Sequence, residues 1–354
     1  LESRENIGGN AYAYIEKETG IEVHKYGSHL FHTSNIRVWD FVNKFSEFNS
    51  YQHRVFTRHQ GVLHPIPINL LTIRQIFGGD FNPQEAASIV KKDLVEFDTS
   101  SESNFESKAI ATIGPKLYNS LIYGYTQKQW GVSPTELPAS ILARLPVRFS
   151  YEDSYFNHPY QAIPRDGYTP IVEAILDHPL IEVTLGRTVS PEELADAEHV
   201  FWSGPIDEYF SGQFGKLGYR TLDFVETEEV GDVQGCPVMN YCDVDVPYTR
   251  ITEHKHFAPW ETHEGSTIYT EYSRLAEDGD IAYYPIRQVK EKEQLVQYIE
   301  AANEATGVTF VGRLGTYRYL DMDVTIKEAL EVASLFLSNR RENRPMPPFV
   351  VNPL

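Results

Sequence analysis

Cysteine and long apolar runs are scarce in this chain of 354 residues. Its two cysteines, Cys236 and Cys242, form a C-x5-C arrangement that fits neither a CxxC redox pair nor a zinc framework. So few thiols in so long a chain favour a reducing compartment. No apolar run approaches the roughly 18 residues of a membrane span, and no charged-then-apolar leader opens the sequence. We therefore expect a soluble cytoplasmic protein.

Basic residues are also in short supply, with 31 Lys and Arg against 50 Asp and Glu and a formal net charge of -19. Nucleic acids and anionic membranes are bound by clustered Lys and Arg, so a field of this sign argues against both as general partners. Any phosphate that the protein binds must be held by local contacts.

Aromatic residues, in contrast, are abundant: the chain has 22 Tyr, 19 Phe and 4 Trp. Tyrosine combines a flat apolar face with a hydroxyl donor, which suits sugars, nucleotides and interfaces. For any single tyrosine, packing in the core is the alternative.

The length predicts two or three domains. Apolar residues recur at helical spacing in 36–48, and 54–67 is typical of a strand pair that turns at Gln60 and Gly61. From Asn69 to about Ala143 the pattern is helical, with Asn69 as the cap of the first helix. Further helices are expected at 85–95, 105–123, 171–176, 292–305 and 325–339.

Short β-rich runs at 146–170 and 219–285 are separated by Gly, Pro and Asp, which predicts a sizeable antiparallel sheet. We also expect strands at 181–185 and 308–311, and a buried strand at 200–205 that ends in a glycine turn. No internal repeat or low-complexity tract is evident.

Glu2 followed by Gly8, Gly9 and Asn10 is the first chemical signal. In dinucleotide folds an acidic residue at the end of the second strand binds ribose hydroxyls, and nearby glycines admit pyrophosphate or flavin. A chance turn is the alternative. The usual G-x-G-x-x-G turn would precede Glu2, where this sequence has no residues.

The second signal, at 311–325, is a strand end, a glycine-rich loop and a helix start. A helix N-terminus suits an anionic or electron-rich cofactor edge, and Asp323 or Thr325 is a candidate cap. Arg313 could meet a phosphate and Tyr319 could face a ligand. A capped helix in a polar loop is the alternative.

Together with these signals, seven motifs distributed along the chain resemble the bacterial type of UDP-galactopyranose mutase. They occur in the family's order and at compatible spacing, which is far more specific than a lone glycine motif. The motifs are 27–32 (GSHLFH), 125–131 (YTQKQWG), 144–148 (RLPVR), 240–242 (NYC), 247–255 (PYTRITEHK), 283–286 (YYPI) and 312–323 (GRLGTYRYLDMD).

The resemblance implies an α/β fold with a discontinuous Rossmann-like FAD-binding domain, a helical domain and an antiparallel sheet substrate domain. The expected boundaries are 1–50, 179–205 and 292–345 for the FAD domain, 69–145 for the helical domain, and 51–68, 146–178 and 206–291 for the sheet domain. The family begins with a strand, a glycine-rich turn and a helix, and this sequence starts after them. We therefore expect weak FAD binding by the chain as given.

The implied activity is the interconversion of UDP-galactopyranose and UDP-galactofuranose, in which N5 of the reduced flavin attacks the anomeric carbon. The implied cofactor is FAD in its reduced form, and the implied reductant is NAD(P)H or another donor. A cytoplasmic homodimer that supplies galactofuranose for cell-wall and polysaccharide synthesis would fit the family.

The resemblance also assigns roles to individual residues. Arg144 and Arg250 match the catalytic diphosphate clamp. Substrate-binding positions are matched by Tyr125, Thr126, Trp130, Tyr155, Asn240, Tyr284, Tyr319 and Asp321. Cofactor-binding positions are matched by Glu2, Gly9, Asn10, His29, Leu30, His32, Arg313 and Met322. His53 departs from the pattern, since family members often carry asparagine there.

Other readings are weaker. His29 and His32 form H-x-x-H, but no third ligand lies at a suitable spacing, so we expect no metal. No G-x-S-x-G elbow for a serine hydrolase occurs. The alternatives that stay open are an amine-oxidase-like flavin oxidoreductase and a truncated, non-catalytic nucleotide-sugar binder.

Overall fold

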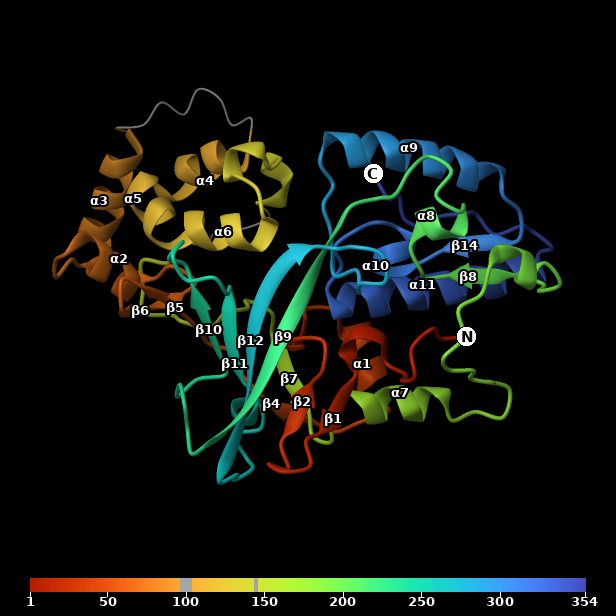
Figure 1. Cartoon of the computed structure of the whole chain (residues 1–354), viewed down its shortest axis with the longest axis horizontal. Helices are drawn as coiled ribbons and strands as arrows, with labels where there is room; N and C mark the ends of the chain where they lie inside the picture. The colour runs from red at the N-terminus through yellow and green to blue at the C-terminus, as the bar shows by residue number, and fades with distance from the viewer. Residues whose placement is uncertain (96–103, 143–145) are drawn as a thin grey trace.

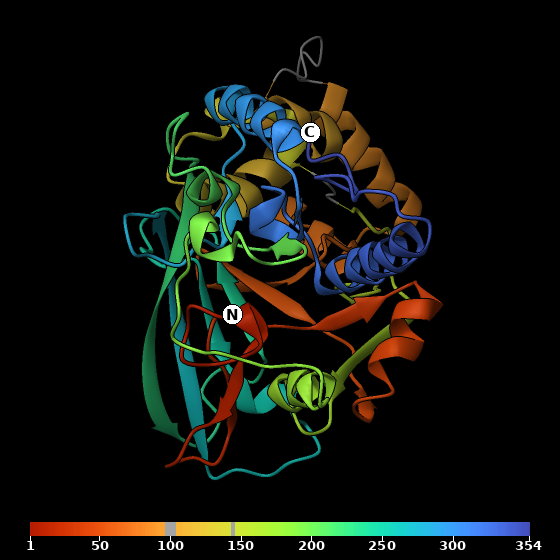
Figure 2. The ribbon, with the colours of Figure 1, turned by 90° about the vertical axis from the view of Figure 1, so that its right-hand side faces the viewer.

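The computed structural model describes residues 1–95, 104–142 and 146–354. Helices α2 to α6 form one group, and α8 to α11 with β8 and β14 form a second group on the opposite side of a long central sheet (Figure 1). Figure 2 shows the β9–β12 ribbon on one side of the molecule and α11 on the other, with α10 and β8 between them.

The central sheet has seven strands in the order β13-β9-β12-β11-β10-β5-β6. Their bounds are β5 Val55–His59, β6 Val62–Ile66, β9 Tyr219–Val230, β10 Val238–Tyr241, β11 Arg250–Glu253, β12 Gly265–Leu275 and β13 Tyr284–Pro285. All neighbours are antiparallel except the parallel pair β10 and β5. The sheet predicted from 219–285 and the strand pair predicted from 54–67 are confirmed.

Strand β7 (Tyr160–Pro164) does not join this sheet, so the prediction that 146–170 contributes to it is wrong for the one strand found there. It pairs with β3 (Phe31–Thr33) and β4 (Phe48–Ser50) in a separate three-stranded sheet. These two neighbours occupy both edges of β7, which leaves no edge for the larger sheet. A short hairpin, β1 (Ala13–Ile15) and β2 (Glu22–His24), precedes them.

The helical group comprises α2 Leu70–Phe77, α3 Pro83–Val95, α4 Phe105–Ile113, α5 Pro115–Leu117 and α6 Tyr123–Trp130. A π-helical turn, Tyr118–Ile122, joins α5 to α6 without a break. Ile73, Ile113 and Leu117 are fully buried in the shared core of this group. The amide of Asn69 accepts hydrogen bonds from the backbone N–H groups of Leu71 and Thr72, so the predicted cap is confirmed.

The Rossmann-like part pairs β8 (Val200–Trp202) in parallel with β14 (Val308–Phe310). Its helices are α8 Ile206–Tyr209, α9 Val289–Glu304, α10 Gly312–Gly315 and α11 Met322–Arg341; α1 Ile36–Val42 and α7 Tyr168–Leu176 lie near the N-terminal hairpin (Figure 1). Gly315 is explained by packing, because a Cβ there would lie 2.6 Å from the Trp202 carbonyl oxygen.

Three local predictions for this part are wrong. Helix α11 has Asp321 as its N-cap residue without a side-chain cap, and Thr325 Oγ1 instead donates to the Asp321 carbonyl. Residues 181–185 form no strand in the described chain; the Glu2 N–H donates to the Thr184 carbonyl instead. Strand β8 is only partly covered, with Phe201 43% exposed, whereas a buried strand was expected.

Among the described residues, none of the helices combines the length and apolarity needed to cross a bilayer.

The cap of α2 gives a stability prediction. Asn69→Ala should lower the free energy of unfolding by about 1 to 2 kcal/mol, because it leaves two backbone donors of a buried helix start without an acceptor. Asn82, which caps α3 in the same way but is exposed, is the matched control and should cost less on mutation to Ala. Urea denaturation of both variants provides the comparison, and an equal loss would contradict the expectation.

Candidate active site

A cleft of about 240 Å³ opens where the central sheet, the segment before β3 and the start of α11 meet. Residues from many separate parts of the chain line it, as expected for a site assembled by the fold. The predicted site residues among them are Asn10, His29, Leu30, His32, Tyr155, Asn240, Arg250, Tyr284, Arg313, Tyr319, Asp321 and Met322.

Arg250, the first residue of β11, lies in a row of polar residues across three strands. The register places Asn240 of β10 on one side of it and Glu271 of β12 on the other. Arg250 Nη1 lies 3.7 Å from a carboxylate oxygen of Glu271, and Nη2 donates to the Tyr125 hydroxyl at 2.8 Å. Glu271 is only 3% exposed and also accepts from Thr249 Oγ1. The buried carboxylate of Glu271 therefore balances the positive charge of Arg250.

Two polar atoms in this row have no partner among the described residues: Arg250 Nε and Asn240 Oδ1, both of them buried. Buried polar atoms are paired in the great majority of structures, so two unpaired ones at one cleft call for an explanation. Both residues line the cleft, which makes them candidates for contact with a polar ligand.

Tyrosine hydroxyls surround the arginine. The rings of Tyr284 and Tyr319 stack with centroids 5.8 Å apart, and Tyr155 and Tyr319 are 40% and 59% exposed. Burial and the neighbouring Glu271 raise the pKa of Tyr284 above its ordinary value. This phenol therefore keeps its proton at neutral pH and can donate a hydrogen bond to an anion.

The opposite wall carries uncharged histidines. His29 Nδ1 lies 2.7 Å from the Gly27 carbonyl oxygen, and burial lowers the pKa of His29 to about 4. His32 stacks on Phe156 with centroids 3.7 Å apart and is hydrogen-bonded to His158. Burial also lowers the pKa of His32. These rings present flat, neutral surfaces suited to an aromatic cofactor.

Arg313 forms part of the floor. Its Nη1 donates to the Tyr283 carbonyl and its Nη2 to the Leu320 carbonyl, at 3.1 and 2.6 Å. The guanidinium carbon lies 4.6 Å from the centroid of the Tyr319 ring. Arg313 therefore fixes the loop that carries Tyr319 and Asp321, and it also adds positive charge to the cleft.

The other predicted residues that the structure describes lie outside the cleft lining. Tyr125 reaches it through Arg250, whereas its helical neighbour Thr126 is buried and Trp130 packs against the helical core. The Glu2 carboxylate accepts from the Arg4 N–H at 2.9 Å, and Gly9 begins a 3-10 turn. Arg144 falls outside the described residues.

Comparison with known proteins identifies the family. The sequence model described as "UDP-galactopyranose mutase" matches residues 120–319, and that of an NAD(P)-binding Rossmann-like domain matches residues 1–45. The chain belongs to the UDP-galactopyranose mutase family. It is therefore a flavin-dependent isomerase that acts between pyranose and furanose forms, as the resemblance predicted.

Two of the similar proteins are named for different nucleotide sugars. A "Probable UDP-galactopyranose mutase" of Klebsiella pneumoniae is 52% identical over 99% of this chain and 91% of its own length. A "dTDP-fucopyranose mutase" of Escherichia coli is 49% identical over 97% and 92%. The crystal structure of a reduced UDP-galactopyranose mutase has a TM-score of 0.71 at 13% identity, covering 95% of this chain and 89% of that one, and supports the α/β flavoprotein fold.

Several cleft residues have no assigned role in the family motifs, among them His53, Phe156 and Glu271. Phe156 and Glu271 lie outside the seven motifs, and His53 stood out only as a departure from the pattern. The one sequence signal for Glu271 was its place as an acidic residue within a β-rich run. Nothing local distinguishes the other two from core residues.

His53 makes one hydrogen bond to a neighbouring side chain. It is buried, its Nδ1 lies 3.2 Å from the Tyr51 hydroxyl, and burial lowers its pKa to about 3. Either atom can be the donor in this contact, so the single imidazole proton lies on Nδ1 or on Nε2. His53 thus places an uncharged imidazole in the wall of the cleft.

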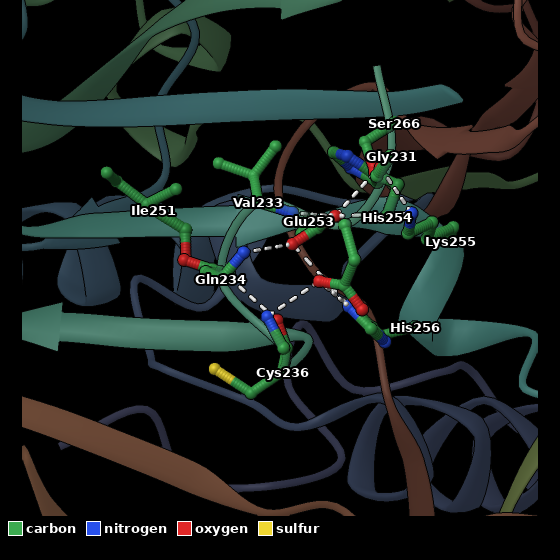
Figure 3. A network of polar contacts seen from close by, with 12 residues as sticks. Gly231, Val233, Gln234, Cys236, Ile251, Glu253, His254, Lys255, His256 and Ser266 are labelled. Atoms are coloured by element: carbon green, nitrogen blue, oxygen red, sulfur yellow. Dashed lines mark hydrogen bonds and ion pairs between the residues drawn. The ribbon is translucent and has the colours of Figure 1, made fainter. Parts of the chain in front are cut away.

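A second polar network anchors the far end of β11 (Figure 3). The Glu253 carboxylate accepts from the backbone N–H groups of Val233 and Gln234, at 3.0 and 2.8 Å, and from the Ser266 hydroxyl. Lys255 and His256 lie 3.7 and 3.5 Å from it. The network joins the segment before β10 to the end of β11. Asn240 lies on β10 and Arg250 lies on β11.

Two groups of ligand-type side chains lie close together among the described residues: His59, Cys242 and Asp243, and Asp232, Glu253 and His256. In the first, His59 pairs with Asp243 at 2.6 Å, while the Cys242 thiol donates to backbone carbonyls. In the second, Glu253 is held by the network of Figure 3. We assign a metal to neither group, since these contacts already engage the donor atoms.

The buried histidines predict a pH dependence of stability. Burial lowers the pKa of His29 and His254 to about 4 and of His53 to about 3, below the usual value of about 6.5 in the unfolded chain. As pH falls from about 6.5 toward 4, the unfolded chain binds protons that the folded chain does not. The contribution of these histidines to the free energy of unfolding should therefore decrease over this range and be nearly constant above it.

Urea denaturation at pH 5, 6 and 7.5 measures this effect. His53→Asn should flatten the slope between pH 5 and 6, and the exposed His178→Asn is the control that should leave it unchanged. An identical slope in wild type and His53→Asn would rule out a neutral, buried His53.

Proposed function

We propose that this chain interconverts UDP-galactopyranose and UDP-galactofuranose, with the corresponding pair of dTDP-fucose as the second candidate. The observation that carries the proposal is the polar row at the cleft: Arg250 and Asn240, each with one unpaired buried atom, line the same cleft as the tyrosine donors and the neutral histidines. A nucleotide sugar needs this combination, because its diphosphate is anionic and its sugar must lie against the cofactor.

The second candidate rests on the comparisons, since relatives named for the two substrates differ by only three percentage points in identity (52% against 49%). The two nucleotide sugars differ by a methyl group on the base, by the 2′-hydroxyl of the ribose and by the hydroxyl at C6 of the sugar. His53 lies in the wall between Arg250 and His32, each close enough to influence its pKa, where a sugar joined to both diphosphate and cofactor would lie. We propose that its imidazole contacts the sugar.

The diphosphate would be held by Arg250 with the hydroxyls of Tyr155, Tyr284 and Tyr319, and by Arg144 as the second arginine of the clamp. Charge accumulates on the departing diphosphate as the glycosidic bond breaks, and charge-assisted donors aimed at it lower the barrier. Glu271 holds the guanidinium in place without competing for the unpaired Nε.

The flavin is proposed to be FAD, with its ring near His29, Leu30, His32, Arg313 and Met322, and with Glu2, Gly9 and Asn10 toward its nucleotide half. When bound and reduced, it supplies a nucleophilic N5 for the anomeric carbon. The chain's own share is to orient the sugar, exclude water and stabilise the leaving diphosphate. NAD(P)H as reductant, a homodimer, a cytoplasmic location and a role in cell-wall polysaccharide synthesis belong to the same proposal, on the strength of the family pattern.

The experiment is an anaerobic assay by chromatography with UDP-galactofuranose and dTDP-fucofuranose, with FAD oxidised or reduced by dithionite. We expect conversion to the pyranose with the reduced cofactor only, at a higher kcat/KM for the UDP sugar. Conversion with oxidised FAD, or none in either state, would overturn the proposal. Net consumption of oxygen or NAD(P)H per product would instead favour an amine-oxidase-like reaction.

The arginine clamp gives a specific prediction. Arg250→Ala should lower kcat/KM at least about 100-fold while flavin content is kept, because a donor to the developing charge is lost. Arg250→Lys should recover only part of the activity, since an ammonium lacks the planar fork. The exposed Arg58→Ala serves as control, and near-normal turnover of Arg250→Ala would place the diphosphate elsewhere.

A further inference from the structure

Lys128 of α6 makes an unusual set of contacts. Its ammonium nitrogen lies within hydrogen-bond distance of four backbone carbonyl oxygens, those of Tyr241, Asp243, Val246 and Tyr248, at 2.7, 2.9, 2.9 and 2.9 Å, so its three N–H groups are shared among them. Tyr241 ends β10 and the other three residues lie between β10 and β11; we call residues 241–249 the 241–249 loop. Four carbonyl dipoles that converge on one point repel each other unless a cation lies between them. The loop conformation therefore depends on a charge supplied by the helix.

One turn earlier on the same face of α6, Gly124 brings the helix backbone against this loop. A Cβ at this position would lie 2.1 Å from the Cys242 carbonyl oxygen. Glycine within a helix costs about 1 kcal/mol relative to alanine, so a packing reason of this kind explains its presence. Positions 124 and 128 are four apart and face the same way. Gly124 permits the close approach, and Lys128 holds it.

The C-terminal end of α6 is held by the sheet as well. The Gln129 carbonyl accepts from Arg220 Nε of β9 at 3.0 Å and from Ser273 Oγ of β12 at 2.7 Å. Helix α6 is thus held by the 241–249 loop through Lys128 and by strands β9 and β12 through Gln129. Of these two contacts, the one with the loop lies next to the cleft.

The loop and the helix meet again at the active site. Asn240 precedes the loop and Arg250 follows it, and Tyr125, between Gly124 and Lys128, accepts a hydrogen bond from Arg250 at 2.8 Å. We propose that Lys128 is a positioning residue for the nucleotide-sugar site: by fixing the 241–249 loop to α6, it sets the placement of Arg250 against Tyr125. The inference rests on the proposed function of Arg250 in binding the diphosphate.

The test uses the flavin-loaded enzyme and UDP as the probe. Lys128→Met, which keeps the volume and removes the charge, should weaken UDP binding at least tenfold in a calorimetric titration while flavin content is kept. Gly124→Ala should have the same effect by pushing the helix off the loop. Lys108→Met is the matched control, because Lys108 lies in the same helical group and donates to one carbonyl, that of Ala139, away from the cleft.

Two further measurements separate positioning from a loss of stability. If Lys128 acts through the Arg250–Tyr125 contact, Tyr125→Phe should weaken UDP binding in the wild type and add little in Lys128→Met. Hydrogen exchange followed by mass spectrometry should be faster in peptides that cover 123–130 and 241–250 of Lys128→Met, without ligand. UDP affinity within twofold of wild type, additive effects of the two substitutions, or unchanged exchange would each overturn the proposal.

Failure of the proposed function gives a different pattern. A wild type that neither binds UDP nor isomerises either nucleotide sugar would refute the function. The exchange measurement would still decide whether Lys128 holds the loop to α6, since it requires no ligand.

Discussion

A partly buried arginine determines how this active site is assembled. The positive charge of Arg250 is tolerated beneath the cleft because Glu271 lies opposite it in the sheet register and Tyr125 accepts from it across the boundary with the helical group. Each partner comes from a different part of the chain. The register of β10, β11 and β12 must therefore be correct before the site exists, and a slip of one residue would turn Arg250 to the other face of the sheet.

The site also reconciles anion binding with a chain of net charge -19. The overall field repels a nucleotide diphosphate, so affinity must come from contacts that act at short range. Arg250 and Arg313 supply positive charge inside the cleft, and the tyrosine hydroxyls supply donors that add no charge. Tyrosine is well suited to this role, because its proton stays in place in a buried setting where a lysine would tend to lose its own.

The sequence predicted those features whose signal is local. The cap at Asn69, the strand pair at 54–67 and the amphipathic helices follow from turn chemistry and periodicity, and the structure has them within a few residues. The motifs predicted most of the cleft lining, because residues such as His29, Tyr284 and Asp321 occur within distinctive sequence motifs. Arg144 stays a prediction, and so do the individual roles.

Features that depend on distant partners were not predictable in the same way. The partners of β7 lie more than 100 positions away along the chain, and nothing in its own residues selects β3 and β4 over the larger sheet. Gly315 was interpreted as part of a cofactor loop, but its close approach is to the Trp202 carbonyl. The contact between Lys128 and the loop likewise depends on carbonyl groups, which every residue has and which no sequence pattern marks.

The π-helical turn Tyr118–Ile122 makes the length of the chain before α6 a constraint in its own right. Such a turn holds one residue more than an α-helical turn, and each added residue rotates the rest of the helix by about 100°. Gly124, Tyr125 and Lys128 face their partners only with that extra residue in place. In evolution this helix can therefore exchange side chains far more freely than it can gain or lose a residue. A single-codon deletion here would turn Gly124, Tyr125 and Lys128 away from the partners that they contact.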